Sequence, residues 1–189
     1  MTVLNKQVAM NKLAEELGSQ KDLPFFPAPL VFGEGSLVAD IFFIGEAPGA
    51  KEEELLRPFV GRSGQLLTKM LESINLKRED VYISNIVKRR PPENRDPTAS
   101  EIKSYLPYLK KQIEIIKPRL IITLGRLAFN CFLPEKKISQ EQGKIFNING
   151  QKLMPILHPA AALRGNKNMN DFKQSFQALK KFLEKNNLK

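Results

Sequence analysis

Four short apolar runs at wide intervals constrain the fold of this chain more than any other feature of its sequence. They are rich in Ile, Val, Leu and Phe, and they lie at residues 40–45, 81–84, 120–124 and 152–157. In strands that have one face in water, apolar and polar residues alternate, but within these runs they do not. The runs therefore predict strands of a mostly parallel sheet that is covered on both faces.

Helical patterns separate and flank these runs. Apolar residues recur at helical spacing over residues 3–17, 63–74, 98–116, 126–132 and 171–184. Alternating strands and helices are typical of an α/β protein. We therefore predict a three-layer α/β/α fold with a central, mostly parallel sheet of about four strands. The length of 189 residues fits a single domain over positions 1–189.

Three further segments carry local signals. Asn149-Gly150 is typical of a type I′ turn, so residues 144–148 are predicted to pair antiparallel with the strand that follows. Residues 22–30 contain three prolines, which predicts an irregular arm. We expect the Lys-rich tail after Lys180 to fray.

The charge and the single cysteine limit the function. The chain has 30 Lys and Arg against 20 Asp and Glu, for a formal charge of +10. This excess favours a polyanionic partner, above all nucleic acid, although a generically basic surface would have the same charge. Cys131 alone can form neither an intrachain disulfide nor a cysteine-rich metal site, which suits a reducing compartment. With no signal-peptide pattern and no apolar stretch near the ~20 residues of a membrane span, we expect a cytoplasmic protein without membrane contact.

Polar and glycine-rich clusters come directly after the predicted strands. Glu46 follows the first strand within a glycine-rich stretch, Asn85 follows the second, Gly125-Arg126 follows the third, and His158 the fourth. In open α/β sheets, ligands bind in the crevice beyond the carboxyl ends of the strands. One pocket is therefore predicted to collect Glu46, Asn85 and His158.

At these positions the chain resembles the type-4 uracil-DNA glycosylases, over about residues 31–164. The motifs that carry the resemblance are VFGEG at 31–35, GEAPG at 45–49, RPFVGRSGQLL at 57–67, SNIVK at 84–88, RPPENR at 90–95 and HPAA at 158–161. The resemblance implies a DNA repair enzyme that flips uracil out of DNA and hydrolyses its N-glycosidic bond, leaving an abasic site.

The resemblance also implies roles for four side chains. Asn85 would read uracil, because its amide oxygen can accept from N3–H while its nitrogen donates to O4, a match that cytosine lacks. Phe59 would stack on the base, and His158, the only histidine in the chain, would donate to uracil O2 as negative charge builds there. Glu46 would position or deprotonate the attacking water, or stabilise the cationic sugar.

Other residues would hold the base or the DNA. Gly45 and Ala47 let the backbone approach the base, and Glu52 fits the second acidic position of the family, although a solvated charge run at residues 52–54 is the plain alternative. The expected DNA contacts lie on the rim of the pocket: Arg62, Ser63, Lys88, Arg89, Arg90, Arg95, Leu163 and Arg164. Among them Leu163 is the candidate wedge between bases, because Ala162 stands where the family commonly has leucine.

Type-4 enzymes carry a four-cysteine iron–sulfur cluster, and this chain departs from that pattern. Arg89 and Tyr105 stand where the second pair of cysteines would fall, and the arm at residues 23–30 replaces the first pair. Cys131 is interpreted as a small buried thiol. We therefore expect no iron–sulfur cluster, no other metal and no cofactor.

Two other functions remain open at this point. A catalytically silent nucleic-acid-binding module of the same fold would need neither Asn85, nor His158, nor Phe59 to hold a phosphate backbone. A flavodoxin-like nucleotide-binding domain would be expected to carry a phosphate loop or a dinucleotide fingerprint, which the sequence lacks. We expect a monomer whose partner is uracil-containing DNA, single- or double-stranded.

Overall fold

The computed structural model describes residues 1–188 and is built around a six-stranded sheet. Its strands are β1 (Glu34–Gly35), β2 (Ile41–Gly45), β3 (Tyr82–Asn85), β4 (Leu120–Leu124), β5 (Phe146–Ile148) and β6 (Gln151–Ile156), in the order β1-β3-β2-β4-β6-β5. The four inner strands are parallel and correspond to the four apolar runs. The two edge strands are antiparallel. The mostly parallel sheet is thus confirmed, with six strands in place of about four.

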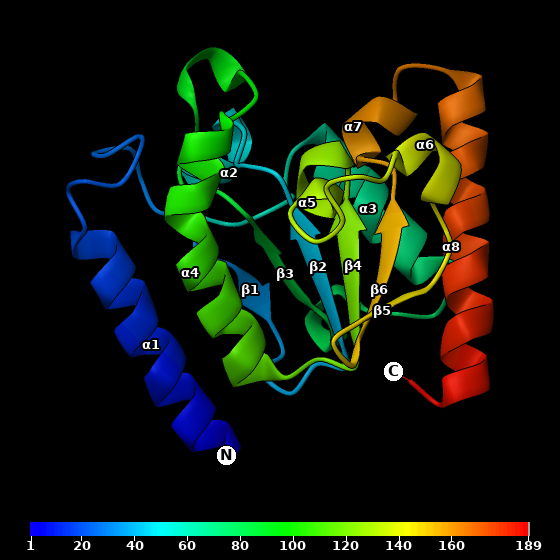
Figure 1. Cartoon of the computed structure of the whole chain (residues 1–189), viewed down its shortest axis with the longest axis horizontal. Coiled ribbons are helices and arrows are strands. Elements are labelled where there is room, and N and C mark those ends of the chain that lie inside the picture. Colours follow the sequence, from blue (N-terminus) through cyan, green and yellow to red (C-terminus); the bar gives the residue numbers. More distant parts are fainter. Residues whose placement is uncertain (189) are drawn as a thin grey trace.

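Helices cover both faces of the sheet. The long ones are α1 (Val3–Ser19), α3 (Arg62–Glu72), α4 (Ala99–Ile116) and α8 (Asn166–Asn186). The short ones are α2 (Ala50–Leu55), α5 (Arg126–Asn130), α6 (Ile138–Glu141) and α7 (Pro159–Ala162), with 3₁₀ turns η1 (Arg78–Asp80) and η2 (Pro92–Asn94). Figure 1 shows α1 and α4 side by side at the left of the sheet and α8 at the right.

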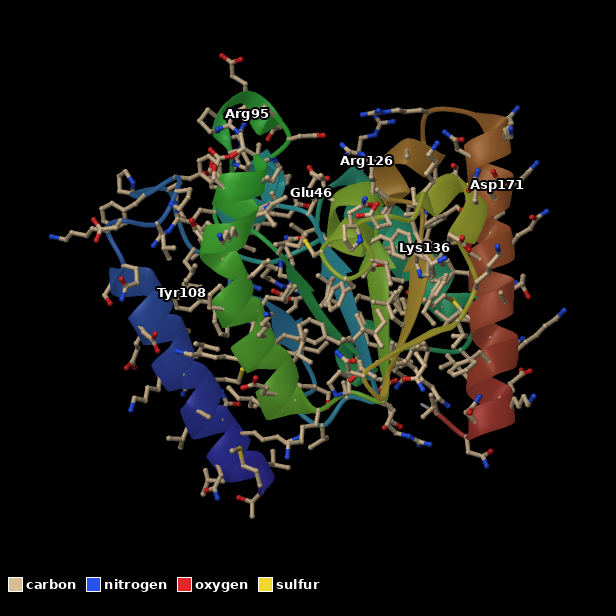
Figure 2. The ribbon with its side chains drawn as sticks, viewed as in Figure 1. Glu46, Arg95, Tyr108, Arg126, Lys136 and Asp171 are labelled. Carbon is tan, nitrogen blue, oxygen red and sulfur yellow. The ribbon has the colours of Figure 1, made fainter. Side chains whose placement is uncertain are left out.

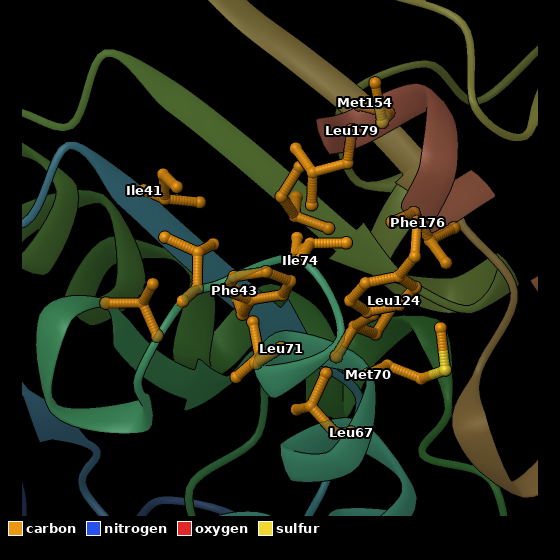
Figure 3. Packing of buried hydrophobic residues seen from close by; sticks show 14 of the residues in the cluster. Ile41, Phe43, Leu67, Met70, Leu71, Ile74, Leu124, Met154, Phe176 and Leu179 are labelled. Carbon is orange, nitrogen blue, oxygen red and sulfur yellow. The ribbon is translucent and has the colours of Figure 1, made fainter. Parts of the chain in front are cut away.

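The apolar strands build a core on each face. Alternate residues of β2 point to opposite sides: Phe43 packs with α3 and α8, whereas Phe42 packs with α1, α4 and α5. Figure 3 shows the first of these clusters, in which Leu67 and Leu71 of α3 and Phe176 of α8 meet the strands. Strands buried on both faces explain why the runs lack alternation, and the three-layer α/β/α fold is confirmed.

Two local expectations are confirmed and one is wrong. Asn149 and Gly150 form the turn between β5 and β6 with positive φ angles of 50° and 86°. The arm at residues 22–30 contains neither helix nor strand. The tail does not fray as expected, because α8 continues to Asn186 with Leu183 buried against the core.

The acidic stretch after the first strand left two alternatives open. One was a solvated charge run at residues 52–54, but residues 50–55 form the helix α2. Its Glu52 turns inward and is 8% exposed. The reason is a set of contacts with the next loop, which is described below.

The carboxyl ends of the parallel strands meet at one edge of the sheet. Gly45 is in register with Asn85, and Leu124 is in register with Ile156. The residues that follow these strands are therefore neighbours, as the sequence predicts. No helix within residues 1–188 is long and apolar enough to cross a membrane.

Candidate active site

A cavity of about 150 Å³ opens at this edge of the sheet. Four of the residues that line it come from separate segments: Glu46, Phe59, Asn85 and His158. The pocket predicted from the strand ends therefore exists in the fold. Its volume suits one small planar ring better than a drug-sized ligand, which needs ~300 Å³ or more. Figure 2 shows Glu46 at the same end of the sheet as Arg95 and Arg126.

Asn85 lines this cavity and is 1% exposed. Its Oδ1 is buried and has no hydrogen-bond partner among residues 1–188. A buried acceptor of this kind is costly unless something donates to it. Because Asn85 also lines the cavity, this oxygen is a candidate acceptor for a ligand there.

Gly45 leaves the space in front of this amide. A Cβ atom built on Gly45 would lie 2.4 Å from Asn85 Oδ1 and 2.4 Å from Phe59 Cζ. Real Cβ atoms do not approach so closely, so a side chain at position 45 would displace either the amide or the ring. The slot between Asn85 and Phe59 depends on this glycine.

Phe59 is held in place by its own loop and by α2. Its φ angle of 52° is in the left-handed region, and its carbonyl would lie 1.9 Å from a Cβ on Gly64. Glu52 Oε1 accepts hydrogen bonds from the backbone N–H of Val60 at 3.0 Å and of Gly61 at 2.8 Å. Glu52 is thus a clamp on the loop that carries Phe59, and the alternative of a solvated charge is wrong for this residue.

His158 is the N-cap residue of α7, and its environment fixes its charge. Burial lowers its pKa to about 4, and the charge of Arg164 acts in the same direction. The ring is therefore neutral at pH 7. Nδ1 accepts from the backbone N–H of Ala160 at 3.2 Å, so the single ring proton is on Nε2. The ring of Phe59 lies next to it, with 5.7 Å between the centroids.

Glu46 is a half-buried carboxyl group with an unusual pKa. Burial raises the pKa to about 7, repulsion by Asp96 adds to the increase, and Arg126 opposes it. Asp96 and Arg126 form an exposed ion pair of 3.3 Å with each other. Glu46 is therefore about half ionised at neutral pH, which is where a general base is effective.

A groove continues from the pocket along the starts of α2, α3 and α7. It shares Glu52 and Ser63 with the pocket and is also lined by Arg62, Leu163 and Arg164. The structure thus brings these expected DNA contacts together. Leu163 is 42% exposed on this groove.

The neighbouring Ala162 is 1% exposed, so it cannot enter DNA in this conformation. Of the two positions considered for a wedge, only that of Leu163 is accessible. This apolar side chain lies among basic residues beside the pocket, which is where a wedge is needed.

On the other side of the pocket, Arg90 and Arg95 are already paired. Arg90 donates to Glu53 at 3.0 Å, and Arg95 forms two hydrogen bonds with Glu101 at 2.6 and 2.9 Å. Arg95 also lines the pocket together with Ala47. Both arginines lie near the site, but their carboxylate partners offset much of their charge.

The expected DNA contact at Lys88 is wrong. Its side chain is 0% exposed and its amine donates to three buried oxygens, so it cannot contact a phosphate. Burial also lowers its pKa. The chain after β3 runs beside the chain after β2, with Ile86 N–H bonded to Gly45 O and Val87 N–H bonded to Glu46 O, which turns Lys88 inward.

Arg89 is buried as well and bonds the N-terminal arm in place of DNA. It donates to the backbone carbonyls of Ala28 and Gly18, and its guanidinium lies over the ring of Phe26 at 5.2 Å. The hydroxyl group of Tyr105 donates to the carbonyl of Pro24 at 2.6 Å. These two residues hold the arm against the core.

The residues present do not fit an iron–sulfur cluster. Such a cluster needs about four thiolates. The positions where the family has its second pair of cysteines hold N–H and O–H donors, on Arg89 and Tyr105, that are committed to the arm. Cys131 donates to Leu127 O at 3.2 Å, and burial raises its pKa to about 11, which disfavours the thiolate. Within residues 1–188, no group of three or more His, Cys, Asp and Glu could hold a metal ion.

An α/β/α fold with a one-ring pocket at the carboxyl edge and a basic groove beside it has the parts that an enzyme needs to act on a base flipped out of nucleic acid. Within this class, residues 32–180 match the family model described as "Uracil DNA glycosylase superfamily", and the chain belongs to that superfamily.

Relatives support the same assignment. The chain is 44% identical over 156 residues to the type-4 uracil-DNA glycosylase of Archaeoglobus fulgidus, and this match covers 78% of each of the two proteins. It is 45% identical over 142 residues to that of Thermotoga maritima, covering 74% of each. A DNA polymerase of Bacillus phage SP01 is 35% identical over 161 residues, 85% of this chain but 17% of the polymerase. The resemblance to the type-4 enzymes is thereby confirmed.

Proposed function

We propose that this protein is a DNA repair glycosylase that removes uracil by hydrolysing its N-glycosidic bond and leaves an abasic site. The superfamily and the type-4 relatives support the reaction. The observation that carries the proposal is Asn85 Oδ1, a buried acceptor with no partner among residues 1–188, on a residue that lines a pocket for one ring.

Recognition of the base rests on Asn85 and Phe59. The Asn85 oxygen accepts from N3–H of uracil and its nitrogen donates to O4, while Phe59 stacks on the ring. Stacking contributes about 1–3 kcal/mol per base. Cytosine offers an acceptor at N3 and a donor at N4, so it mismatches both ends of the amide.

Bond cleavage rests on His158 and Glu46. The C1′–N1 bond breaks and its electron pair stays on uracil, while the sugar becomes an oxocarbenium-like cation. His158, neutral and protonated on Nε2, donates to uracil O2 as the negative charge grows there. Water adds to C1′ and gives a proton to Glu46, whose carboxylate also stabilises the cation.

The groove beside the pocket holds the DNA strand. Arg62 and Arg164 neutralise phosphates there, and Leu163 fills the space that the flipped nucleotide leaves. This arrangement serves single- or double-stranded DNA. The protein acts as a monomer that forms a single domain over residues 1–189. It acts in the cytoplasm, where Cys131 stays reduced.

The proposed reaction needs no iron–sulfur cluster and no metal. Its groups are a carboxyl, an imidazole, an amide and a phenyl ring, all supplied by the chain. The arm is held by Arg89 and Tyr105, which bond its carbonyls directly.

The similarity to part of a phage DNA polymerase favours a second candidate, a nucleic-acid-binding module without activity. Binding alone would not need an unpartnered amide oxygen in a buried slot. The module is therefore the weaker candidate.

The test is incubation of the purified protein with an oligonucleotide that contains one uracil, followed by detection of abasic sites as alkali-labile breaks. We expect cleavage at the uracil position and none on the matched thymine or cytosine strand. If the protein binds the uracil oligonucleotide and its matched control but produces no abasic sites, the silent module is favoured.

A further inference from the structure

Lys88 lies directly behind the recognition residue Asn85, and its amine has three partners. Nζ donates to the backbone carbonyl of Asn85 at 2.6 Å, to Ser84 Oγ at 2.7 Å and to Gln112 Oε1 at 2.5 Å. Burying an amine of this kind is costly, so the fold keeps it only where its bonds replace those to water. The reaction described above does not use it.

The need for Lys88 follows from where β1 ends. β1 pairs with β3 only at Ile83 and Tyr82, so it does not reach Asn85. On the opposite side, Ile86 N–H donates to Gly45 O of β2 at 2.9 Å. That N–H and the Asn85 carbonyl belong to one planar peptide unit and point to opposite sides. Lys88 therefore supplies the hydrogen bond that a neighbouring strand would otherwise make.

The neighbours of Lys88 fix the position of its amine. Gln112 of α4 donates through Nε2 to Phe32 O at 3.0 Å, and Ser84 Oγ donates to the same carbonyl at 2.7 Å. Both side chains then present an oxygen to Lys88. Each member of this buried network has a defined donor or acceptor role, which is the condition under which such networks hold a single geometry.

We propose that Lys88 is a positioning residue for uracil recognition, holding the peptide unit of Asn85 from behind so that the Asn85 amide faces the base. The proposal rests on the proposed function of the pocket. Oδ1 of the amide has no partner among residues 1–188, so its direction depends on the backbone that carries it and on the narrow space between Gly45 and Phe59.

The first test replaces the amine by an apolar chain of similar length, Lys88→Met. A misplacement of about 1 Å in a site can cost about 10²-fold in rate, so we expect single-turnover uracil excision to fall by 10- to 100-fold. Binding of DNA should stay close to wild type, because Lys88 does not reach the groove. A wild-type rate for Lys88→Met would overturn the proposal.

A double-mutant cycle with Asn85→Ala separates positioning from a general effect. If Lys88 acts through Asn85, the variant Lys88→Met in the Asn85→Ala background should lower the rate no further than Asn85→Ala alone. Equal fold-losses in both backgrounds would show that Lys88 acts on something else and would contradict the proposal.

Two variants control for loss of stability. Arg89→Met removes the adjacent buried cation, which bonds the arm and not Asn85, so it should lower the melting temperature without changing the excision rate well below that temperature. In Lys88→Met/Gln112→Leu the amine and one of its three acceptors become apolar together, so fewer buried groups lose a partner than in Lys88→Met alone. This double variant should fold even if Lys88→Met does not, and it should still excise slowly. Wild-type excision by the double variant would count against Lys88.

The proposed function itself can fail separately. If the wild-type protein releases no uracil under any condition, the function of the pocket is wrong. If the wild type is active and Lys88→Met is equally active, only the role of Lys88 is wrong.

Discussion

At the scale of single residues, the site assigns different tasks to Asn85, His158 and Glu46 through their environments. Asn85 presents a fixed acceptor, His158 a fixed donor without charge, and Glu46 a carboxyl group poised between its two forms. The pKa of His158 is about 4 and that of Glu46 is about 7. This separation is the pattern by which paired acids and bases are assigned their roles.

The pKa of Glu46 predicts how the rate of uracil excision depends on pH. If Glu46 acts as the carboxylate, single-turnover excision should rise with pH through about 7, the value to which burial and Asp96 raise its pKa, and then level off. Asp96→Asn removes the repulsion and should move the midpoint to lower pH. Arg126→Gln removes the opposing cation and should move it to higher pH. A rate profile that neither substitution moves would argue against Glu46.

At the scale of elements, the parallel strands and the pocket they form could be predicted because each strand is a local apolar pattern. The sequence also places Asn85 and His158 correctly in the pocket, because Asn85 lies at the carboxyl end of one such strand and His158 follows another. β1 could not be predicted, because a two-residue strand is defined only by pairing with β3. The burial of Lys88 depends on Gln112, which is 24 positions away in the chain. The sequence alone therefore shows Lys88 only as part of a run of three basic residues at 88–90, which is typical of an exposed segment.

The close approach of β2 to the Phe59 loop yields a prediction for Gly45. Gly45→Ala should abolish uracil excision, because the added Cβ would lie 2.4 Å from both Asn85 Oδ1 and Phe59 Cζ and would fill the slot. Single-turnover assays on a uracil oligonucleotide measure this. Gly18→Ala is the matched control in α1, where the added Cβ meets its nearest atom at 3.9 Å, and it should leave excision unchanged.

At the scale of the whole molecule, the charge of +10 is divided between free and paired groups. Arg62 and Arg164 line the groove, whereas Arg90 and Arg95 are held by Glu53 and Glu101. Net charge alone therefore overstates the surface available to DNA.

Salt dependence tests this division. Each phosphate contact contributes about −0.9 to the slope of log affinity against log salt on duplex DNA, so Arg62→Ala and Arg164→Ala should each flatten it by about one unit. Lys77→Ala, before β3 at the other end of the sheet, should leave it unchanged. Equal slopes for all these variants would remove the groove from the DNA path.

The absence of a fitting cysteine set predicts metal-free activity. The purified protein should be colourless, contain no stoichiometric iron and release uracil in the presence of a chelator. Cys131→Ser should retain excision, since this cysteine lies outside the pocket. Iron bound in proportion to protein, together with loss of activity on chelation, would contradict the prediction.

The most direct test of the account is single-turnover excision by wild type, Asn85→Asp and His158→Ala, with DNA binding measured in parallel. His158→Ala should bind uracil-containing DNA nearly as well as wild type, and its rate should fall by roughly 10²–10³-fold, as on loss of one oxyanion-type donor. Asn85→Asp should lose excision, because an ionised carboxylate facing O4 repels it. Wild-type rates of uracil release from both variants would contradict the account, since no other residue in the pocket is assigned their tasks.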